Sequence, residues 1–126
     1  MRVFVTKTFK RFQRKEAIGG ETLCEAIQRA GRGLIDADLG AGLIKQRVGR
    51  PGQGRSGGYR TIIAYRKETR SVFLYGFPKN TQANIGAADR RDLADYGRML
   101  LDLGEEGIAA MIEAEELMEI ECHDEE

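Results

Sequence analysis

The N-terminal part of the chain combines a short apolar run with stretches in which apolar residues recur at helical spacing. Residues 2–5 suit a short strand. Phe9 and Phe12, three positions apart among basic residues, predict an amphipathic helix with both rings in the core. Gly19 and Gly20 are expected to end that helix.

A second helix is expected directly after these glycines. Thr22 and Glu25 have the spacing of a capping box, in which a hydroxyl and a carboxylate satisfy free amides of the first helical turn. Gly31 and Gly33 mark its end. The apolar stripe of this helix consists of Leu23, Ala26, Ile27 and Ala30.

Beyond Gly40 the pattern changes to strands. Residues 43–48, 59–66 and 72–77 are rich in β-branched and aromatic side chains and predict three strands. A short connection suits a hairpin between the last two strands, and the third is almost continuously apolar, as in a central strand covered on both faces. The glycine-rich residues 49–58 predict a loop between the first two strands.

Helical spacing returns in the C-terminal third. It predicts helices over residues 93–103 and 105–116, with Gly104 as the C-cap of the first. Residues 118–122 alternate apolar and acidic side chains and leave open a final edge strand. The inward side chains of the last helix are expected to be Ile108, Met111 and Ile112.

These elements predict an α+β fold. Their order is β-α-α-β-β-β-α-α, with the final strand left open, and the helices are expected to pack on one face of a small, mostly antiparallel sheet. A chain of 126 residues is the size of one domain. We therefore expect a single domain over 1–126, with a core over 1–104 and an acidic extension over 105–126.

The net charge of zero conceals a division along the chain. Residues 1–84 hold 17 Lys and Arg against 6 Asp and Glu, whereas residues 85–126 hold 3 against 14. A basic body can concentrate phosphates while an acidic segment limits indiscriminate binding. The acidic extension over 105–126 is expected either to lie near the basic face and weaken non-specific RNA binding or to form an ordinary solvated helix.

Cys24 and Cys122 lie far apart and lack metal-ligand spacing, so free thiols are expected. The basic N-terminus has no apolar core of the signal-peptide type, and no run is long enough to span a bilayer. A soluble, cytoplasmic protein without membrane partners is expected.

No acidic residue occurs between Asp38 and Glu68, and this stretch surrounds the glycine-rich loop with bases. A loop without large apolar side chains cannot bury itself for stability, so a polyanion is the expected partner. The bases of the stretch are Lys45, Arg47, Arg50, Arg55, Arg60, Arg66 and Lys67.

The residue types near these bases disfavour metal and histidine chemistry. The basic half has no carboxylate cluster, and the chain has one histidine, His123, so no metal or other cofactor is expected. A cation-rich site still permits RNA cleavage, because attack of a ribose 2′-OH on the adjacent phosphate builds negative charge that Arg and Lys stabilise. Lys45 and Lys79 are candidates for the base, since neighbouring cations lower a lysine pKa.

The same cations are compatible with binding alone. Arg60 lies where the loop enters a strand, and it is either a phosphate ligand or a solvent-facing strand residue. Tyr59, Tyr65 and Tyr75 either stack on bases or pack half-buried in the sheet. The residues assigned to RNA binding are Arg50, Arg55, Tyr59 and Arg66.

The chain resembles the RelE/HigB group of bacterial toxins from type II toxin–antitoxin systems. The segments that carry the resemblance are GLIKQRVGRPGQGRSGGYR, GGYRTIIAYR and GFPKNTQANI. The resemblance covers most of the chain and implies a RelE-like fold with ribosome-dependent cleavage of mRNA by metal-free 2′-OH attack. It also implies a neutralising antitoxin encoded beside the toxin, of helix-turn-helix type. A homodimer and a heterotetramer with the antitoxin are both left open.

By position, the resemblance assigns catalytic roles to four residues. Arg60 matches the GYR arginine that stabilises the scissile phosphate, Lys45 and Arg47 match bases of the preceding strand, and Lys79 matches a base after the apolar strand. Ile85 stands where the best-studied RelE proteins have a tyrosine, which argues against a tyrosine-assisted mechanism. Two alternatives remain: a ParE-like inhibitor of DNA gyrase, and a non-catalytic protein that binds RNA or an antitoxin.

Overall fold

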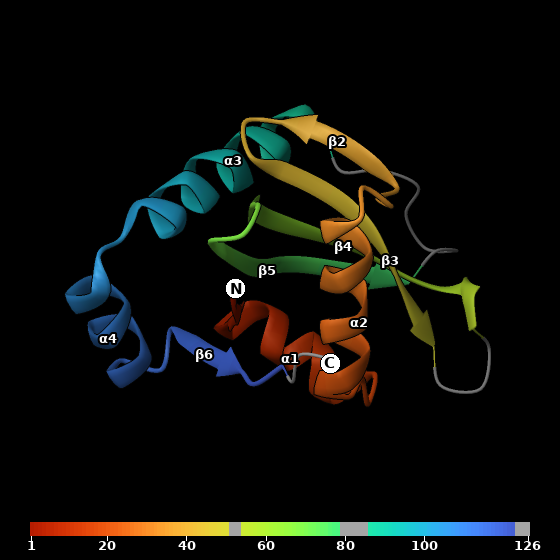
Figure 1. The fold of residues 1–126 in the computed structure, drawn as a ribbon, viewed down its shortest axis with the longest axis horizontal. Helices are drawn as coiled ribbons and strands as arrows, with labels where there is room; N and C mark the ends of the chain where they lie inside the picture. Colours follow the sequence, from red (N-terminus) through yellow and green to blue (C-terminus); the bar gives the residue numbers. More distant parts are fainter. Residues whose placement is uncertain (51–53, 79–85, 123–126) are drawn as a thin grey trace.

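In the computed structural model of the protein, a six-stranded sheet is flanked by helices, which confirms the expected α+β class (Figure 1). The structure describes residues 1–50, 54–78 and 86–122, without the side chains of residues 50 and 54–57. The elements in chain order are β1 (Arg2–Thr6), α1 (Lys7–Lys15), α2 (Gly20–Gly31), β2 (Ala37–Gly40), β3 (Leu43–Arg50), β4 (Gly54–Arg66), β5 (Arg70–Pro78), α3 (Ala87–Asp102), α4 (Glu105–Glu113) and β6 (Leu117–Ile120).

The strands lie in the order β2-β3-β4-β5-β1-β6. All neighbours are antiparallel except β1 and β5, which are parallel. The almost continuously apolar β5 is central, as predicted, and the last strand, β6, forms one edge. The other edge, β2, was not predicted, because its four residues, ADLG, have no strand-like run of β-branched or aromatic side chains.

Helices cover both faces of the sheet, and the expectation of a single covered face was wrong. Phe73 of β5 packs in a core with α1 and α2, whereas its neighbours Val72 and Leu74 pack in a second core with α3 and α4. Successive strand residues point to opposite faces, so an uninterrupted apolar strand requires cover on both. The apolar run of β5 therefore already indicated the two helical layers.

The end of α1 and the start of α2 differ from those predicted, whereas α2 ends at Gly31 as expected. The Thr6 hydroxyl caps α1 by accepting from the Phe9 amide at 3.1 Å, and the helix ends before Ala17, whose φ is 56°. Gly19 is the N-cap of α2, and its carbonyl accepts from the Thr22 amide at 3.2 Å. The predicted capping box at Thr22 is therefore wrong, because the helix has already begun there.

The C-terminal helices also differ in detail. Gly104 is the N-cap of α4, and Leu103 is the C-cap of α3. Ile108 is buried and Met111 partly buried, as expected, but Ile112 is 37% exposed. The short α4 therefore turns only one side toward the sheet, and Ile112 lies at its margin.

The strands β3 and β4 extend into the segment predicted as a loop. Arg50 pairs with Gly54 beyond a register shift, so much of the predicted loop 49–58 belongs to the two strands. Residues 51–53, between them, lie outside the described part of the chain. The hairpin between β4 and β5 is confirmed, with Lys67–Thr69 as the turn.

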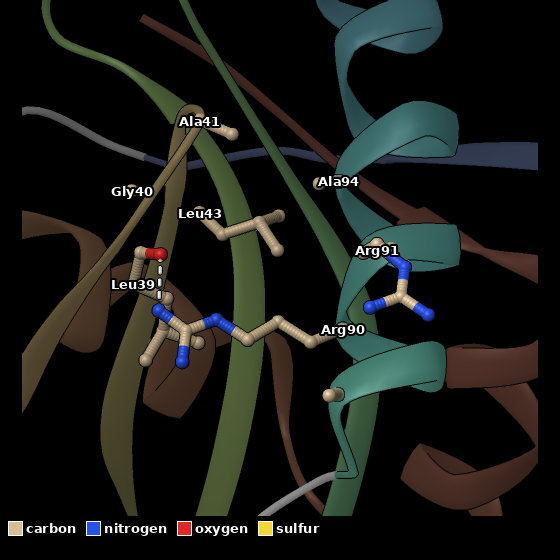
Figure 2. A pocket seen from close by; sticks show the side chains of 8 residues that line it. Leu39, Gly40, Ala41, Leu43, Arg90, Arg91 and Ala94 are labelled. Atoms are coloured by element: carbon tan, nitrogen blue, oxygen red, sulfur yellow. Dashed lines mark hydrogen bonds between the residues drawn. The ribbon is translucent and has the colours of Figure 1, made fainter.

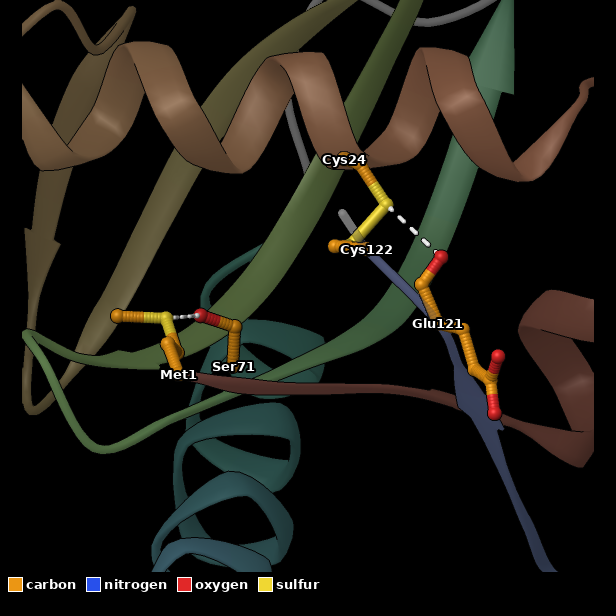
Figure 3. Close-up of a disulfide and its surroundings, with 5 residues drawn as sticks. All are labelled: Met1, Cys24, Ser71, Glu121 and Cys122. Atoms are coloured by element: carbon orange, nitrogen blue, oxygen red, sulfur yellow. Dashed lines mark hydrogen bonds between the residues drawn. A yellow bond between two sulfur atoms is a disulfide. The ribbon is translucent and has the colours of Figure 1, made fainter. Parts of the chain in front are cut away.

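A disulfide joins Cys24 of α2 to Cys122, which contradicts the expectation of free thiols (Figure 3). The two Cα atoms are 5.6 Å apart although 98 positions separate them in sequence. Because β6 pairs with β1, Cys122 lies next to α2. The proximity of the two cysteines therefore depends on a final edge strand that the sequence analysis did not decide.

None of the helices among residues 1–50, 54–78 and 86–122 combines the length and the apolar character needed to cross a bilayer.

Candidate functional site

Arg47 of β3 and Arg60 of β4 lie directly opposite each other in the sheet. Side chains two positions apart on a strand share a face, so Arg47 points to the same side as Leu43, and Arg60 to the same side as Ile62. Both of those apolar residues pack in the core beneath α3. The two arginines therefore occupy the α3 side of the sheet, toward the end where β3 and β4 approach the glycine-rich segment.

The carboxylate of Asp36 lies between the two guanidinium groups. Its Oδ1 is 3.0 Å from Arg47 Nε, and its Oδ2 is 3.4 Å from Arg60 Nε. The Asp36 side chain is 15% exposed and that of Arg60 is 11% exposed, so this pair is shielded from water, whereas Arg47 is 46% exposed. One partly buried carboxylate thus offsets the repulsion between two arginines that the sheet places side by side.

Arg60 retains an unsatisfied donor. Its Nη1 atom is buried and has no hydrogen-bond partner within residues 1–50, 54–78 and 86–122. A buried guanidinium N–H without an acceptor is costly, and a phosphate oxygen is a strong acceptor for such a group. A phosphate oxygen brought against this guanidinium would therefore satisfy the donor.

The helix α2 holds the backbone of β3 in position. Arg29 donates through Nη2 to the Arg47 carbonyl at 2.6 Å and through Nε to Glu25 at 2.7 Å. The buried Gln46 side chain donates to the carbonyls of Ala26 and Leu34 at 2.9 and 3.0 Å. These bonds fix the strand from the face opposite to Arg47, which gives the site a rigid base.

Lys45 belongs to the same face of β3 as Arg47, two residues away. It is partly buried, and its carbonyl accepts from the Asp36 amide at 3.0 Å. Lys45 pairs with Ile62 in the sheet, so it lies diagonally from Arg60, a relationship that places Cβ atoms about 7–8 Å apart. The structure therefore gathers Lys45, Arg47 and Arg60 in one small area.

The other predicted catalytic position, Lys79, lies outside the described residues, as does Ile85. Arg50 and Arg55 lie on β3 and β4, but their side chains are not among those described. Their assignment to RNA binding stays a prediction.

Tyr59 is not placed for stacking on bases, contrary to the prediction. The residue is 1% exposed and its ring packs edge-on against Phe12, with centroids 5.3 Å apart. Its hydroxyl donates to Glu16 at 2.8 Å. Tyr59 precedes Arg60 on β4 and thus points to the opposite face, into the core beneath α1 and α2.

Arg66 is also removed from the site. It lies six residues beyond Arg60 on the same strand, about 20 Å away at the rise of an extended chain. Its guanidinium donates to the Leu101 carbonyl at 3.0 Å and pairs with Asp102 at 2.8 Å. Arg66 therefore anchors the C-terminal end of α3, a structural role that composition alone did not distinguish from RNA binding.

The described part of the acidic extension over 105–126 lies toward the β6 edge of the sheet, opposite to the β2 edge. It forms α4 and β6. Strand β1 pairs with β6, and Arg2 of β1 forms ion pairs with Glu105 and Glu119 at 2.8 and 2.9 Å. Strands β5 and β1 separate β6 from β4. These acids consequently neutralise Arg2 rather than the arginines on β3 and β4.

A separate groove of about 460 Å³ lies between the β2–β3 turn and the N-terminal half of α3 (Figure 2). Arg90 crosses it to donate to the Leu39 carbonyl, while Arg91 lies on the helix beside it. None of the predicted site residues whose side chains the structure describes lines this groove. Among the residues that the structure describes, no group of three or more His, Cys, Asp or Glu side chains is placed to hold a metal ion.

Asp36 and Arg29 are the functional neighbours that sequence reasoning missed. Asp36 lies two residues before Asp38, the acid that precedes the acid-free stretch, but only the pairing of β2 with β3 brings Asp36 to Arg47 and Arg60. Arg29 lies on an otherwise apolar face of α2, where a buried charge usually has a specific partner. That isolated base was the available clue.

Comparison with known proteins agrees with this arrangement. No curated protein matches the chain at a significant level. The family model described as the RelE toxin of the RelE/RelB toxin–antitoxin system matches residues 1–120, a range that runs from β1 to β6 and includes the three gathered cations. The chain therefore belongs to the RelE family, as the toxin component of a toxin–antitoxin system whose other component is an antitoxin.

Proposed function

We propose that this toxin is an endoribonuclease that cuts mRNA on the ribosome by attack of a ribose 2′-OH on the adjacent phosphate. The observation that carries the proposal is the pair Arg47 and Arg60, held side by side by Asp36, with a buried donor of Arg60 unsatisfied. Family membership supports a toxic activity, and the paired arginines supply the chemistry for a phosphate substrate.

In this reaction the 2′-oxygen forms a bond to phosphorus and the bond from phosphorus to the 5′-oxygen of the next nucleotide breaks. The products are a 2′,3′-cyclic phosphate and a free 5′-hydroxyl. Negative charge accumulates on the non-bridging oxygens as the 2′-oxygen attacks. Arg60, the more buried of the two arginines, is proposed to bind these oxygens, because a donor that is fixed and shielded from water stabilises developing charge best.

The exposed Arg47 is proposed to hold the substrate backbone on the solvent side of Arg60. Lys45, on the same face of β3, is proposed to accept the proton from the 2′-OH, with Lys79 as the second candidate for this base. The 5′-oxygen takes up a proton from water as it leaves, which gives the free 5′-hydroxyl. The ribosome would hold one nucleotide step of the mRNA with its 2′-OH in line for attack on the phosphate. The small toxin then does not have to orient the substrate alone.

The test compares cleavage of ribosome-bound mRNA by the wild-type toxin, by Arg60→Ala and by Arg60→Lys, with Arg66→Ala as the matched control. Arg66 is an arginine of the same strand whose guanidinium binds α3 instead. Loss of Arg60 is expected to lower the cleavage rate about 100-fold to 1,000-fold, the usual cost of removing one donor to a developing charge. Arg60→Lys should recover part of that rate.

The products are read by mapping their 5′ ends and by detecting the terminal cyclic phosphate. Uncut mRNA with the wild-type toxin, or equal rates for wild type and Arg60→Ala, would overturn the proposal. A supercoiling assay with DNA gyrase on the same preparations is expected to show no inhibition, and inhibition abolished by Arg60→Ala would favour a gyrase-directed toxin.

A further inference from the structure

The helix α1 presents four cations on one face. Lys7, Lys10, Arg11 and Arg14 follow the i, i+3, i+4, i+7 spacing of neighbours on a helix, so they form a stripe about 10 Å long. Three of them are exposed and Lys10 is partly buried. None of the four side chains makes a hydrogen bond or ion pair with any residue that the structure describes. We call them the α1 stripe.

The α1 stripe borders a groove of about 430 Å³ whose other side is formed by α4 and β6. Apolar side chains line that side: Ile112 is 37% exposed, Met118 is partly buried and Leu117 is buried. Glu115 is the one acid among the lining residues. The groove thus combines an apolar wall with a wall of unpaired positive charge.

This groove is separate from the arginines on β3 and β4. The α1 helix lies on the face of the sheet opposite to Arg47 and Arg60, and β6 is three strands from β4, about 14 Å across the sheet. A ligand in the groove therefore would not occupy the proposed cleavage site.

The composition of the two walls indicates what binds there. A nucleic-acid backbone would use the α1 stripe but would leave Ile112 and Met118 without apolar partners. An amphipathic helix with acidic residues along one side of its apolar face would satisfy both walls, since helices commonly bind grooves through an apolar face flanked by complementary charge. Protein interfaces typically combine an apolar centre with a polar rim in this way.

We propose that the groove between α1 and α4 binds an acidic amphipathic helix of the antitoxin that family membership implies. The proposal rests on the family for its partner but not on RNA cleavage. Its failure and the failure of the cleavage proposal are therefore separate results. Binding here would hold the toxin from the side away from Arg60 and would leave the proposed catalytic face accessible unless the antitoxin also extends around the sheet.

The test uses a synthetic helical peptide of about four turns, about 14–15 residues, with leucines on one face flanked by glutamates, labelled for fluorescence anisotropy. A second peptide has glutamine at every glutamate position, and a short RNA duplex serves as the nucleic-acid probe. The toxin variants are Lys10→Glu/Arg14→Glu, Ile112→Ser, and the control Arg91→Glu/Arg98→Glu, which makes the same charge change on the exposed face of α3.

The acidic peptide is expected to bind the wild-type toxin, and the Lys10→Glu/Arg14→Glu change should weaken it about tenfold or more, as expected for reversal of two interface charges. Ile112→Ser should weaken binding of the peptide but not binding of the RNA duplex. The α3 control should bind the peptide as tightly as the wild type does. Cleavage by Lys10→Glu/Arg14→Glu should persist.

Three outcomes would overturn the proposal. The acidic peptide fails to bind, it binds no better than its glutamine counterpart, or the RNA duplex alone depends on the α1 stripe. The last result would identify the stripe as a nucleic-acid surface. Far-ultraviolet circular dichroism of each variant, matched to wild type, shows that any loss of binding is not a loss of fold.

Discussion

Arg47 and Arg60 face each other across β3 and β4 and share the two carboxylate oxygens of Asp36. Two adjacent guanidinium groups repel each other, and each would otherwise turn toward water. The carboxylate instead holds both in fixed positions on a rigid part of the sheet. Asp36 therefore acts as a positioning residue for the cations proposed to bind phosphate.

The first prediction concerns Asp36→Asn. The amide keeps the shape of the side chain but removes the charge that holds Arg47 and Arg60, so cleavage should slow about tenfold to 100-fold through lost orientation. Affinity for RNA at low salt should stay equal or rise, because a negative charge leaves the site. Single-turnover rates and RNA binding, measured separately, distinguish the two effects.

Asp38→Asn is the control for this change. Asp38 lies two residues along the chain and accepts from the Gly40 amide at 2.9 Å, away from both arginines. Asp38→Asn should keep the cleavage rate within about twofold of the wild-type rate. That change is much smaller than the loss expected for Asp36→Asn, which alters a positioning residue. Equal losses for the two variants, or lower RNA affinity with Asp36→Asn, would contradict the positioning role.

The sequence predicted most of the strands and helices because their apolar periodicity is set locally. It failed at β2, where pairing with β3 supplies the stability that local propensity lacks, and Asp36 could be linked to Arg60 only through that pairing. The disulfide was missed for the same kind of reason, since β6 has to pair with β1 before Cys122 reaches Cys24.

Within the acid-free stretch, composition could not separate bases by their surroundings. Arg60 and Arg66 lie on one strand and share a side-chain type, yet one faces Asp36 and the other binds the end of α3. Side chains alternate along β4, so Tyr59 and Arg60 point to opposite faces, although the sequence analysis assigned both residues to the RNA site. Both faces carry a core, and Tyr59 packs in the one beneath α1 and α2, whereas Arg60 lies on the α3 side.

The second prediction is that Tyr59 contributes to stability and not to RNA affinity. Tyr59→Phe removes the hydrogen bond to Glu16 and should lower the free energy of unfolding by about 1 kcal/mol. Tyr59→Leu should cost more, because it also removes the contact with Phe12. A stacking tyrosine would instead give about 1–3 kcal/mol of RNA affinity. Urea denaturation and RNA titration of the two variants test this, and weaker RNA binding by folded Tyr59→Leu would contradict it.

The third prediction concerns Arg70, the buried base at the start of β5. Its Nη1 donates to the carbonyls of Leu100 and Leu103 at 2.8 Å each and lies near the C-terminal end of α3, where a positive charge is favourable. Arg70→Met should lower the free energy of unfolding by about 2–4 kcal/mol because these carbonyls lose a charged donor. Arg66→Ala, which removes an exposed pair, should cost about 1 kcal/mol or less. Comparable losses in chemical denaturation would show that Arg70 is no more important than Arg66.

The fourth prediction concerns the disulfide between Cys24 and Cys122. In the chain-entropy account, closing a loop of about 100 residues stabilises the folded state by up to about 4.7 kcal/mol. A reducing agent should therefore lower the melting temperature of the wild-type protein markedly. Cys24→Ser/Cys122→Ser should melt at the lower temperature whether or not the reductant is present. Hydrogen exchange should show faster exchange of β6 after reduction, and unchanged melting would mean that the bond does not form in solution.

The fifth prediction concerns acid stability at Glu119. Its hydrogen bond to Arg2 lowers the pKa of the Glu119 carboxyl below the ordinary value of 4.5. A carboxyl with a lowered pKa in the folded state contributes stability above its unfolded pKa and loses it as the pH falls through the folded pKa. The pair is more than one third exposed, so the contribution should be at most about 1 kcal/mol and should shrink in high salt.

The comparison of wild type with Glu119→Gln across an acid series tests this sign. The two proteins should differ in free energy of unfolding near neutral pH, and the difference should vanish below the folded pKa of Glu119, because the protonated carboxyl no longer binds Arg2 as an ion. Glu121→Gln is the control, since the Glu121 carboxylate pairs with no residue in the described part of the chain. A gap that widens on acidification would mean that Glu119 is bound as a neutral acid, and that β6 is held to β1 by its backbone pairing rather than by this charge.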